Sequence, residues 1–98
     1  MSATIYLTYV KPDPLVEWYE ESAEVTALID SYKSDGRMIE QIVEDVDGVT
    51  RKYTLTFDNL PRSLELESEP VMQSWIIARN NHNTTNNITV TKTYGPGL

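Results

Sequence analysis

The chain has 98 residues, a net charge of −7 from 15 acidic and 8 basic side chains, and no cysteine. This length predicts a single domain, residues 1–98, and the charge disfavours binding to nucleic acid and to anionic membrane surfaces. The lack of cysteine excludes disulfides, thiol catalysis and thiolate metal sites. The sequence has no apolar run of membrane-spanning length and no secretory signal, so we expect an intracellular protein.

The first two predicted elements are a strand and a long helix. Residues 3–10 alternate in polarity and are rich in β-branched and aromatic side chains, which is typical of a strand. Asp13 is a favourable N-cap and Pro14 suits the first helical position, so we expect a helix from Pro14 that ends before Gly36. Its predicted inner stripe has a 3-4-3-4-3 spacing and consists of Leu15, Trp18, Ser22, Val25, Ile29 and Tyr32.

A hairpin is predicted next, because Asp47-Gly48 separates two alternating runs and suits a two-residue type I′ turn. The resulting register pairs like with like and acid with base: Val46 with Val49, Glu44 with Arg51, Ile42 with Tyr53, and Met38 with Phe57. It also puts Glu40 opposite Leu55 on the apolar face. We therefore expect either a β-bulge near Glu40 or a later start of the strand.

A helical region in two pieces and a final strand follow. Asn59-Leu60-Pro61 predicts a short helix through about Leu66, and Ser68-Glu69-Pro70 predicts the start of a second helix. The expected inner stripe of the second helix is Val71, Trp75, Ala78 and His82, with Met72, Ile76 and Arg79 beside it. Residues 87–94 alternate and predict a strand.

The asparagine-rich run 79–87 has two interpretations. Asparagine favours helix ends because it tolerates left-handed backbone angles, so the run can be the end of the helix and a loop. Alternatively, Arg79, His82 and neighbouring asparagines form the polar lip of a pocket.

The predicted β-α-β-β-α-β order indicates an α+β, ferredoxin-like sandwich, with a four-stranded antiparallel sheet and two helices on one face. RNA recognition modules share this order, but here the aromatic face of the third strand is predicted to point to the core. The helix-free face, which we call the open face, is either a wet threonine surface or a protein interface. The expected interface residues are Tyr6, Val10, Ile39, Val43, Thr54 and Thr91.

Catalytic and metal-binding motifs are absent from the sequence. His82 is the single histidine, and the chain has neither a G-x-S-x-G stretch nor a glycine-rich phosphate loop. We therefore expect no metal and no cofactor.

Two resemblances concern the layout of the chain. The succession GRMIEQIVEDVDG, RKYTLTFDN and LPRSLELESEPVMQSWIIARNNHN resembles the dimeric α/β-barrel group of ferredoxin-like proteins, which includes cofactor-independent monooxygenases and haem-degrading relatives. This resemblance implies a pocket between sheet and helices. The segment SEPVMQSWIIARNNHNTTNNITVT resembles the C-terminal part of small proteins encoded by tailed phages, which implies a virion or assembly component.

The sequence leaves two functional hypotheses. The first is a non-enzymatic structural or interaction module that self-associates through its sheet or binds another protein, with a phage virion as one setting. The alternative is a small-molecule-binding enzyme of the dimeric α/β-barrel type, similar to cofactor-independent monooxygenases. Its pocket would be lined by Trp18, Trp75, Arg79 and His82.

Overall fold

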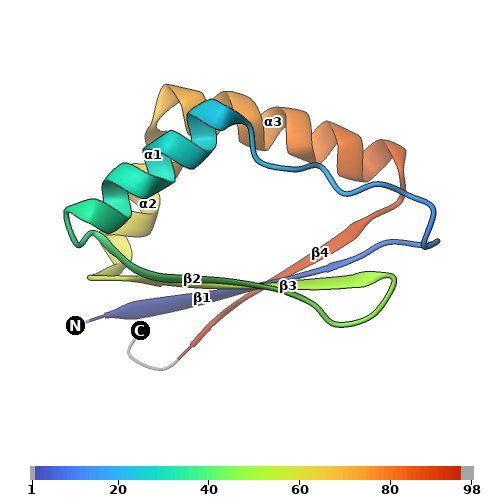
Figure 1. Cartoon of the computed structure of the whole chain (residues 1–98), viewed down its shortest axis with the longest axis horizontal. Helices are drawn as coiled ribbons and strands as arrows, with labels where there is room; N and C mark the ends of the chain where they lie inside the picture. Colours follow the sequence, from blue (N-terminus) through green and yellow to red (C-terminus); the bar gives the residue numbers. More distant parts are fainter. Residues whose placement is uncertain (1, 96–98) are drawn as a thin grey trace.

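A computed structural model describes residues 2–95 and shows one helix layer on one sheet. Its elements are β1 (Ala3–Val10), α1 (Ala23–Ser34), β2 (Met38–Asp45), β3 (Thr50–Phe57), α2 (Leu60–Ser68), α3 (Pro70–Thr85) and β4 (Thr89–Tyr94). The antiparallel sheet has the order β2-β3-β1-β4, and Figure 1 shows the helices on one face of it. This arrangement confirms the predicted ferredoxin-like α+β fold, with its second helical region divided into α2 and α3.

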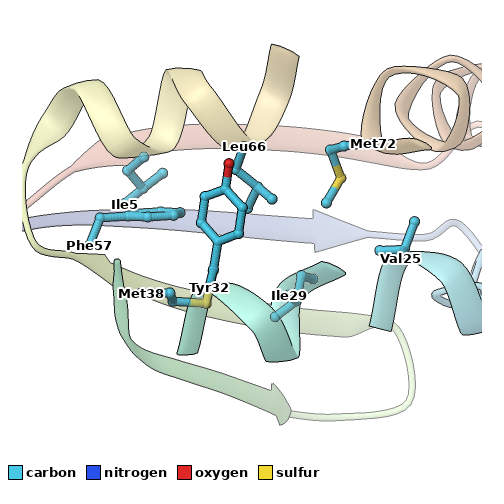
Figure 2. Close-up of a cluster of buried hydrophobic side chains, with 8 residues drawn as sticks. All are labelled: Ile5, Val25, Ile29, Tyr32, Met38, Phe57, Leu66 and Met72. Carbon is cyan, nitrogen blue, oxygen red and sulfur yellow. The ribbon is translucent and has the colours of Figure 1, made fainter. Parts of the chain in front are cut away.

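The hydrophobic core lies between the sheet and the helices (Figure 2). It consists of Ile5, Val25, Ile29, Tyr32, Met38, Phe57, Leu66 and Met72. Leu7 and Leu55 also face the helices from the two central strands, yet both are only partly buried. The helix layer therefore does not close completely on the middle of the sheet.

The predicted start of the first helix at Pro14 is wrong, because α1 begins at Ala23. Ser22 is its N-cap, and the Ser22 side chain accepts a hydrogen bond from the backbone N–H of Val25 at 3.2 Å. Asp13, the expected cap, instead accepts from the N–H of Leu15 at 2.8 Å and forms a local turn. The C-terminal part of the predicted stripe is correct, since Val25, Ile29 and Tyr32 are buried.

Residues 11–22, which we call the strap, run without regular structure from the end of β1 along α3 to α1 (Figure 1). Three backbone carbonyl oxygens of the strap, which would accept backbone N–H groups in a helix, accept hydrogen bonds from side chains instead. Lys11 Nζ donates to Val16 O at 2.6 Å, His82 Nε2 donates to Glu17 O at 2.8 Å, and Trp75 Nε1 donates to Glu20 O at 3.0 Å. These bonds satisfy the backbone in an extended form, so a helix is not needed to do so.

The hairpin register also differs from the predicted one. The N–H of Val46 donates to Thr50 O at 2.9 Å, which leaves three loop residues rather than two. Neither Asp47 nor Gly48 has the positive φ of a type I′ turn. Asp47 Oδ1 instead accepts from the N–H of Val49 at 2.8 Å.

This one-residue shift exchanges the two faces of β2. Val43 pairs with Tyr53 and therefore lies on the helix-covered face, whereas Ile42 lies on the open face. A β-bulge between Met38 and Glu40 restores the predicted pairing of Met38 with Phe57. The expected bulge is thus confirmed, and Glu40 lies on the open face rather than in the core.

The element boundaries of the C-terminal half follow the prediction closely, but the inner stripe of the second helix is shifted, because Val71 is 42% exposed and the buried residues of α3 are Met72 and Asn83. Asn59 caps α2 by accepting from the N–H of Arg62 at 3.1 Å. Helix α3 continues through most of the asparagine-rich run to Thr85 and has Asn86 as its C-cap, after which Asn87 takes a left-handed φ of 57°. None of the helices within residues 2–95 is long and apolar enough to cross a bilayer.

Candidate functional site

A cavity of about 300 Å³ lies between the sheet and the helix layer. The sheet contributes Ile5, Leu7, Leu55 and Phe57, and the helices contribute Val25, Ile29, Leu66, Met72, Trp75 and Ile76. Several of these residues belong to the core cluster drawn in Figure 2. The core of this domain and the wall of the cavity are therefore largely the same residues.

Polar side chains gather at the end of the cavity where β1 ends and the hairpin turns. The rings of Tyr9 and Tyr53 lie on adjacent strands, with centroids 5.1 Å apart. The Arg79 guanidinium reaches from α3 to lie 5.8 Å from the Tyr9 ring and 5.3 Å from the Trp75 ring. This end of the cavity thus combines two phenols, an indole and one cation.

Both phenols are protonated at neutral pH, and burial makes them still harder to ionise. Burial raises the pKa of Tyr9, an effect that the nearby Arg79 charge opposes, and it also raises the pKa of Tyr53, where Arg51 opposes it. A free tyrosine has a pKa of about 10. Both hydroxyls are therefore protonated at neutral pH and can donate hydrogen bonds to a ligand.

Polar contacts tie both edge strands to the segments above the sheet. At the β2 edge, Gln41 Nε2 donates to Glu21 Oε2 at 3.3 Å, and at the β4 edge Lys92 Nζ donates to Glu67 Oε1 at 3.3 Å. All four residues line the cavity. These contacts flank the cavity at the two edges of the sheet.

The four residues expected around a pocket fall into two groups. Trp75 and Arg79 line the cavity. Trp18 and His82 are not among its lining residues: Trp18 packs edge-on against Tyr9 with ring centroids 6.3 Å apart, and His82 binds the strap carbonyl of Glu17. His82 therefore holds the strap, and of the predicted polar lip only Arg79 reaches the cavity.

The residues expected at an interface do not share one face. Tyr6, Val10, Thr54 and Thr91 lie on the open face, as their pairing shows. Val43 lies on the opposite, helix-covered face and Ile39 lies in the bulge.

Tyr9, Tyr53, Gln41 and Glu21 were missed in the sequence. Tyrosines on the core-facing side of two predicted strands do carry a usable signal, because a buried hydroxyl needs a polar partner. Gln41 and Glu21 carried no signal, since their placement depends on the hairpin register and on the strap. Among residues 2–95, no three metal-ligating side chains gather in one place.

Neither known family models nor curated proteins match this chain. Solved structures do match, and three illustrate the likeness. SnoaB, a cofactor-independent oxygenase from Streptomyces nogalater, has a TM-score of 0.64 at 9% identity, over 99% of this chain and 93% of its own. A candidate antibiotic biosynthesis monooxygenase from Caulobacter crescentus CB15 has a TM-score of 0.64 at 10% identity, over 98% and 90%. A further candidate from Deinococcus radiodurans has a TM-score of 0.56 at 18% identity, over 97% and 92%. At these identities the likeness establishes the fold.

These findings correct the first functional hypothesis. The interpretation as a non-enzymatic phage structural module is wrong, because several of the structures that share this fold over at least 90% of both chains are described as oxygenases or monooxygenases.

Proposed function

We propose that this chain is a small-molecule-binding enzyme of the oxygenase type, which holds an aromatic substrate in the cavity between the sheet and the helices. The observation that carries the proposal is the apolar 300 Å³ cavity with its polar end at Tyr9 and Tyr53. Ligand sites are mostly apolar, with a few polar groups that orient the ligand, and range from about 300 to 1,000 Å³.

The energetic cost of the cavity supports this proposal. A closed, dry apolar cavity costs about 24 cal/mol per Å³, so ~7 kcal/mol is an upper bound for this cavity of about 300 Å³, which is partly open to water. That amount is comparable to the whole stability of a small domain, about 5–15 kcal/mol. Access to water lowers the cost, but a well-filled core would avoid it entirely. A bound apolar ligand explains why this core is left unfilled.

The proposed type of reaction restricts the class of substrate. In a cofactor-independent oxygenase reaction the electrons that reduce O₂ come from the substrate, so the proposed substrate is an easily oxidised aromatic. A methylene between two aromatic rings fits: two C–H bonds break, one oxygen atom becomes the carbonyl oxygen and the other leaves in water, so CH₂ + O₂ gives C=O + H₂O. Glu21 is the proton acceptor in this proposal, because its carboxylate lines the cavity. Its hydrogen-bond donors, Thr26 and Gln41, are neutral groups that do not compensate the negative charge.

A matched pair of substitutions on α3 tests the proposal. Ile76 lines the cavity, whereas its neighbour Ile77 is 62% exposed. Ile76→Phe should fill part of the cavity, weaken the binding of 1,8-dihydroxyanthraquinone at least tenfold and keep or raise the melting temperature, because a void is filled. Ile77→Phe should change neither quantity. Binding is measured by quenching of tryptophan fluorescence, since Trp75 lies in the cavity wall.

Catalysis is tested separately, by oxygen uptake with 1,8-dihydroxyanthrone above the uncatalysed rate. Uptake by the native chain and by Ile77→Phe, but not by Ile76→Phe, is the expected result. If neither hydroxylated anthracene compound binds the native chain, the proposal fails. Binding without oxygen uptake would contradict the proposed oxygenase activity and would show that the chain is a ligand-binding protein.

Self-association is the second part of the proposal. Tyr6, Val10 and Ile42 lie on the open face and are 38–39% exposed, so apolar surface there can be covered by a second copy. We expect light scattering after size-exclusion chromatography to give the mass of a dimer. Tyr6→Asp should shift it to the monomer by placing an unpaired charge in the contact, whereas Ile77→Asp on the outer face of α3 should not. A native monomer at all concentrations would contradict this expectation.

A further inference from the structure

Arg79 differs from the other arginines in the partners of its charge. Arg37, Arg51 and Arg62 each form ion pairs with carboxylates. Among residues 2–95, Arg79 forms none, although the chain has 15 acidic side chains. Its hydrogen bonds go to the neutral Asn80 Oδ1, at 3.1 Å from Nη2 and 3.4 Å from Nε. A guanidinium has five N–H donors, so most of them stay available to a ligand.

The position of Arg79 places that charge in the cavity wall. The residue is half-buried on α3, and its guanidinium lies near the rings of Tyr9 and Trp75. Cation–π attraction to these rings holds the group without neutralising its charge. An available cation in a partly buried, mostly apolar site attracts an anion more strongly than one in bulk water, because less water screens it.

The remaining charges of the cavity do not cancel that of Arg79. Lys92 and Glu67 pair with each other at 3.3 Å. The Glu21 carboxylate accepts hydrogen bonds from Gln41 Nε2 at 3.3 Å and from Thr26 Oγ1 at 3.2 Å. Among residues 2–95 no carboxylate forms an ion pair with Arg79, so its charge is available to a ligand near Tyr9.

We propose that Arg79, together with the Tyr9 hydroxyl, binds an acidic oxygen on the aromatic ligand, either a phenolate or a carboxylate. The inference rests on the proposed function, because it assumes that an aromatic molecule enters this cavity. Arg79 then selects ligands that carry an anion and fixes which end of the ring system lies at Tyr9. A guanidinium suits this role, since its planar N–H groups match a carboxylate or an oxyanion.

Two isosteric ligands test the carboxylate form. Isothermal calorimetry should show 2-naphthoate binding the native chain at least about tenfold more tightly than neutral 2-naphthamide, a difference of about 1.4 kcal/mol. Arg79→Gln should remove the preference and leave the binding of 2-naphthamide unchanged. Arg79→Lys should restore part of it, because the charge returns without the planar donors. Lys52→Gln changes the net charge equally at an exposed site of the open face and should leave the preference intact.

A chromogenic naphthol tests the phenolate form. The absorbance of 4-nitro-1-naphthol reports its ionisation, and its pKa should fall on binding to the native chain but not on binding to Arg79→Gln. A preference for naphthoate without this pKa shift assigns the site to carboxylates. A pKa shift of the naphthol without a preference for naphthoate assigns it to phenolates.

The failures of the two proposals are distinguishable. Equal affinity for 2-naphthoate and 2-naphthamide, with both weakened by Ile76→Phe and no shift of the naphthol, would overturn the role of Arg79 while the aromatic cavity stands. No binding of any of these compounds would overturn both. Circular dichroism of Arg79→Gln and Arg79→Lys checks that each variant is folded before its affinities are compared.

Discussion

Replacing Phe57 with alanine should lower the free energy of unfolding by about 3–5 kcal/mol. Phe57 is 2% exposed and lies at the end of β3, where it pairs with Ala3 on β1 and Met38 on β2. Its ring belongs to the core cluster drawn in Figure 2 and also lines the cavity, so truncation would enlarge a void that is already present. The loss therefore includes the burial of the ring and the cost of the added volume. Against a typical net stability of about 5–15 kcal/mol, a substantial fraction of the variant would be unfolded.

Urea denaturation followed by circular dichroism measures this loss, with Leu64→Ala as the control. Leu64 is 59% exposed on α2, and its truncation should change the free energy of unfolding by less than about 0.5 kcal/mol. A loss below about 1 kcal/mol for Phe57→Ala would mean that the helices collapse into the vacated space. Such a core would be too plastic to hold the cavity open for a ligand.

The fold was predictable because its elements carry local signals. The alternation of residues 3–10 predicts β1, and the Asn59 and Pro70 signals predict the break between α2 and α3. The strap is the main exception, although its sequence contains a good cap signal at Asp13. Its carbonyls bind His82 and Trp75, more than 50 residues away, and no local pattern reports such partners.

The hairpin shows how an error in the predicted turn changes which residues are expected beside the cavity. Asp47-Gly48 predicts a two-residue turn, but the side chain of Asp47 favours a three-residue loop by binding the N–H of Val49. The resulting shift moves Val43 to the helix-covered face and brings Gln41 opposite Leu55, beside the cavity. Because the side-chain period of a strand is two residues, a shift of one residue exchanges every side chain between the faces.

The candidate site was only half predictable. Trp75 and Arg79 lie at helical spacing on one predicted face of α3, and both line the cavity. Tyr9 and Tyr53 were not predicted as site residues, because a pattern of alternation cannot show whether the space above a strand is filled. The cavity depends on the distance between two layers, which is a property of the whole fold.

Alkaline pH should destabilise this protein steeply, because three of its tyrosines resist ionisation in the folded state. Burial is the largest cause of the raised pKa of Tyr9, Tyr32 and Tyr53. Tyr32 is fully buried, and its hydroxyl donates to Glu65 Oε2 at 3.1 Å and Glu69 Oε2 at 3.2 Å, so ionisation would place three negative charges together.

The direction of the effect follows from proton linkage. Above a pH of about 10 the unfolded chain loses phenolic protons that the folded chain retains, so the free energy of unfolding falls as pH rises. The stabilising effect is complete below pH 10 and is lost as the pH rises toward the folded pKa values. Each tyrosine contributes up to about 1.4 kcal/mol per pH unit, and the three together up to about 4 kcal/mol per pH unit.

Tyr32→Phe isolates the contribution of Tyr32. The variant should lose about 1 kcal/mol at pH 7, because the two hydrogen bonds are removed, but its stability should fall with pH about one third less steeply above pH 10. Urea denaturation of both proteins at intervals from pH 7 to pH 11 measures the two slopes, and the range from pH 7 to pH 9 is the internal control. Equal slopes above pH 10 would show that the Tyr32 phenol ionises as readily in the fold as in the unfolded chain. The carboxylates of Glu65 and Glu69 would then not act on it.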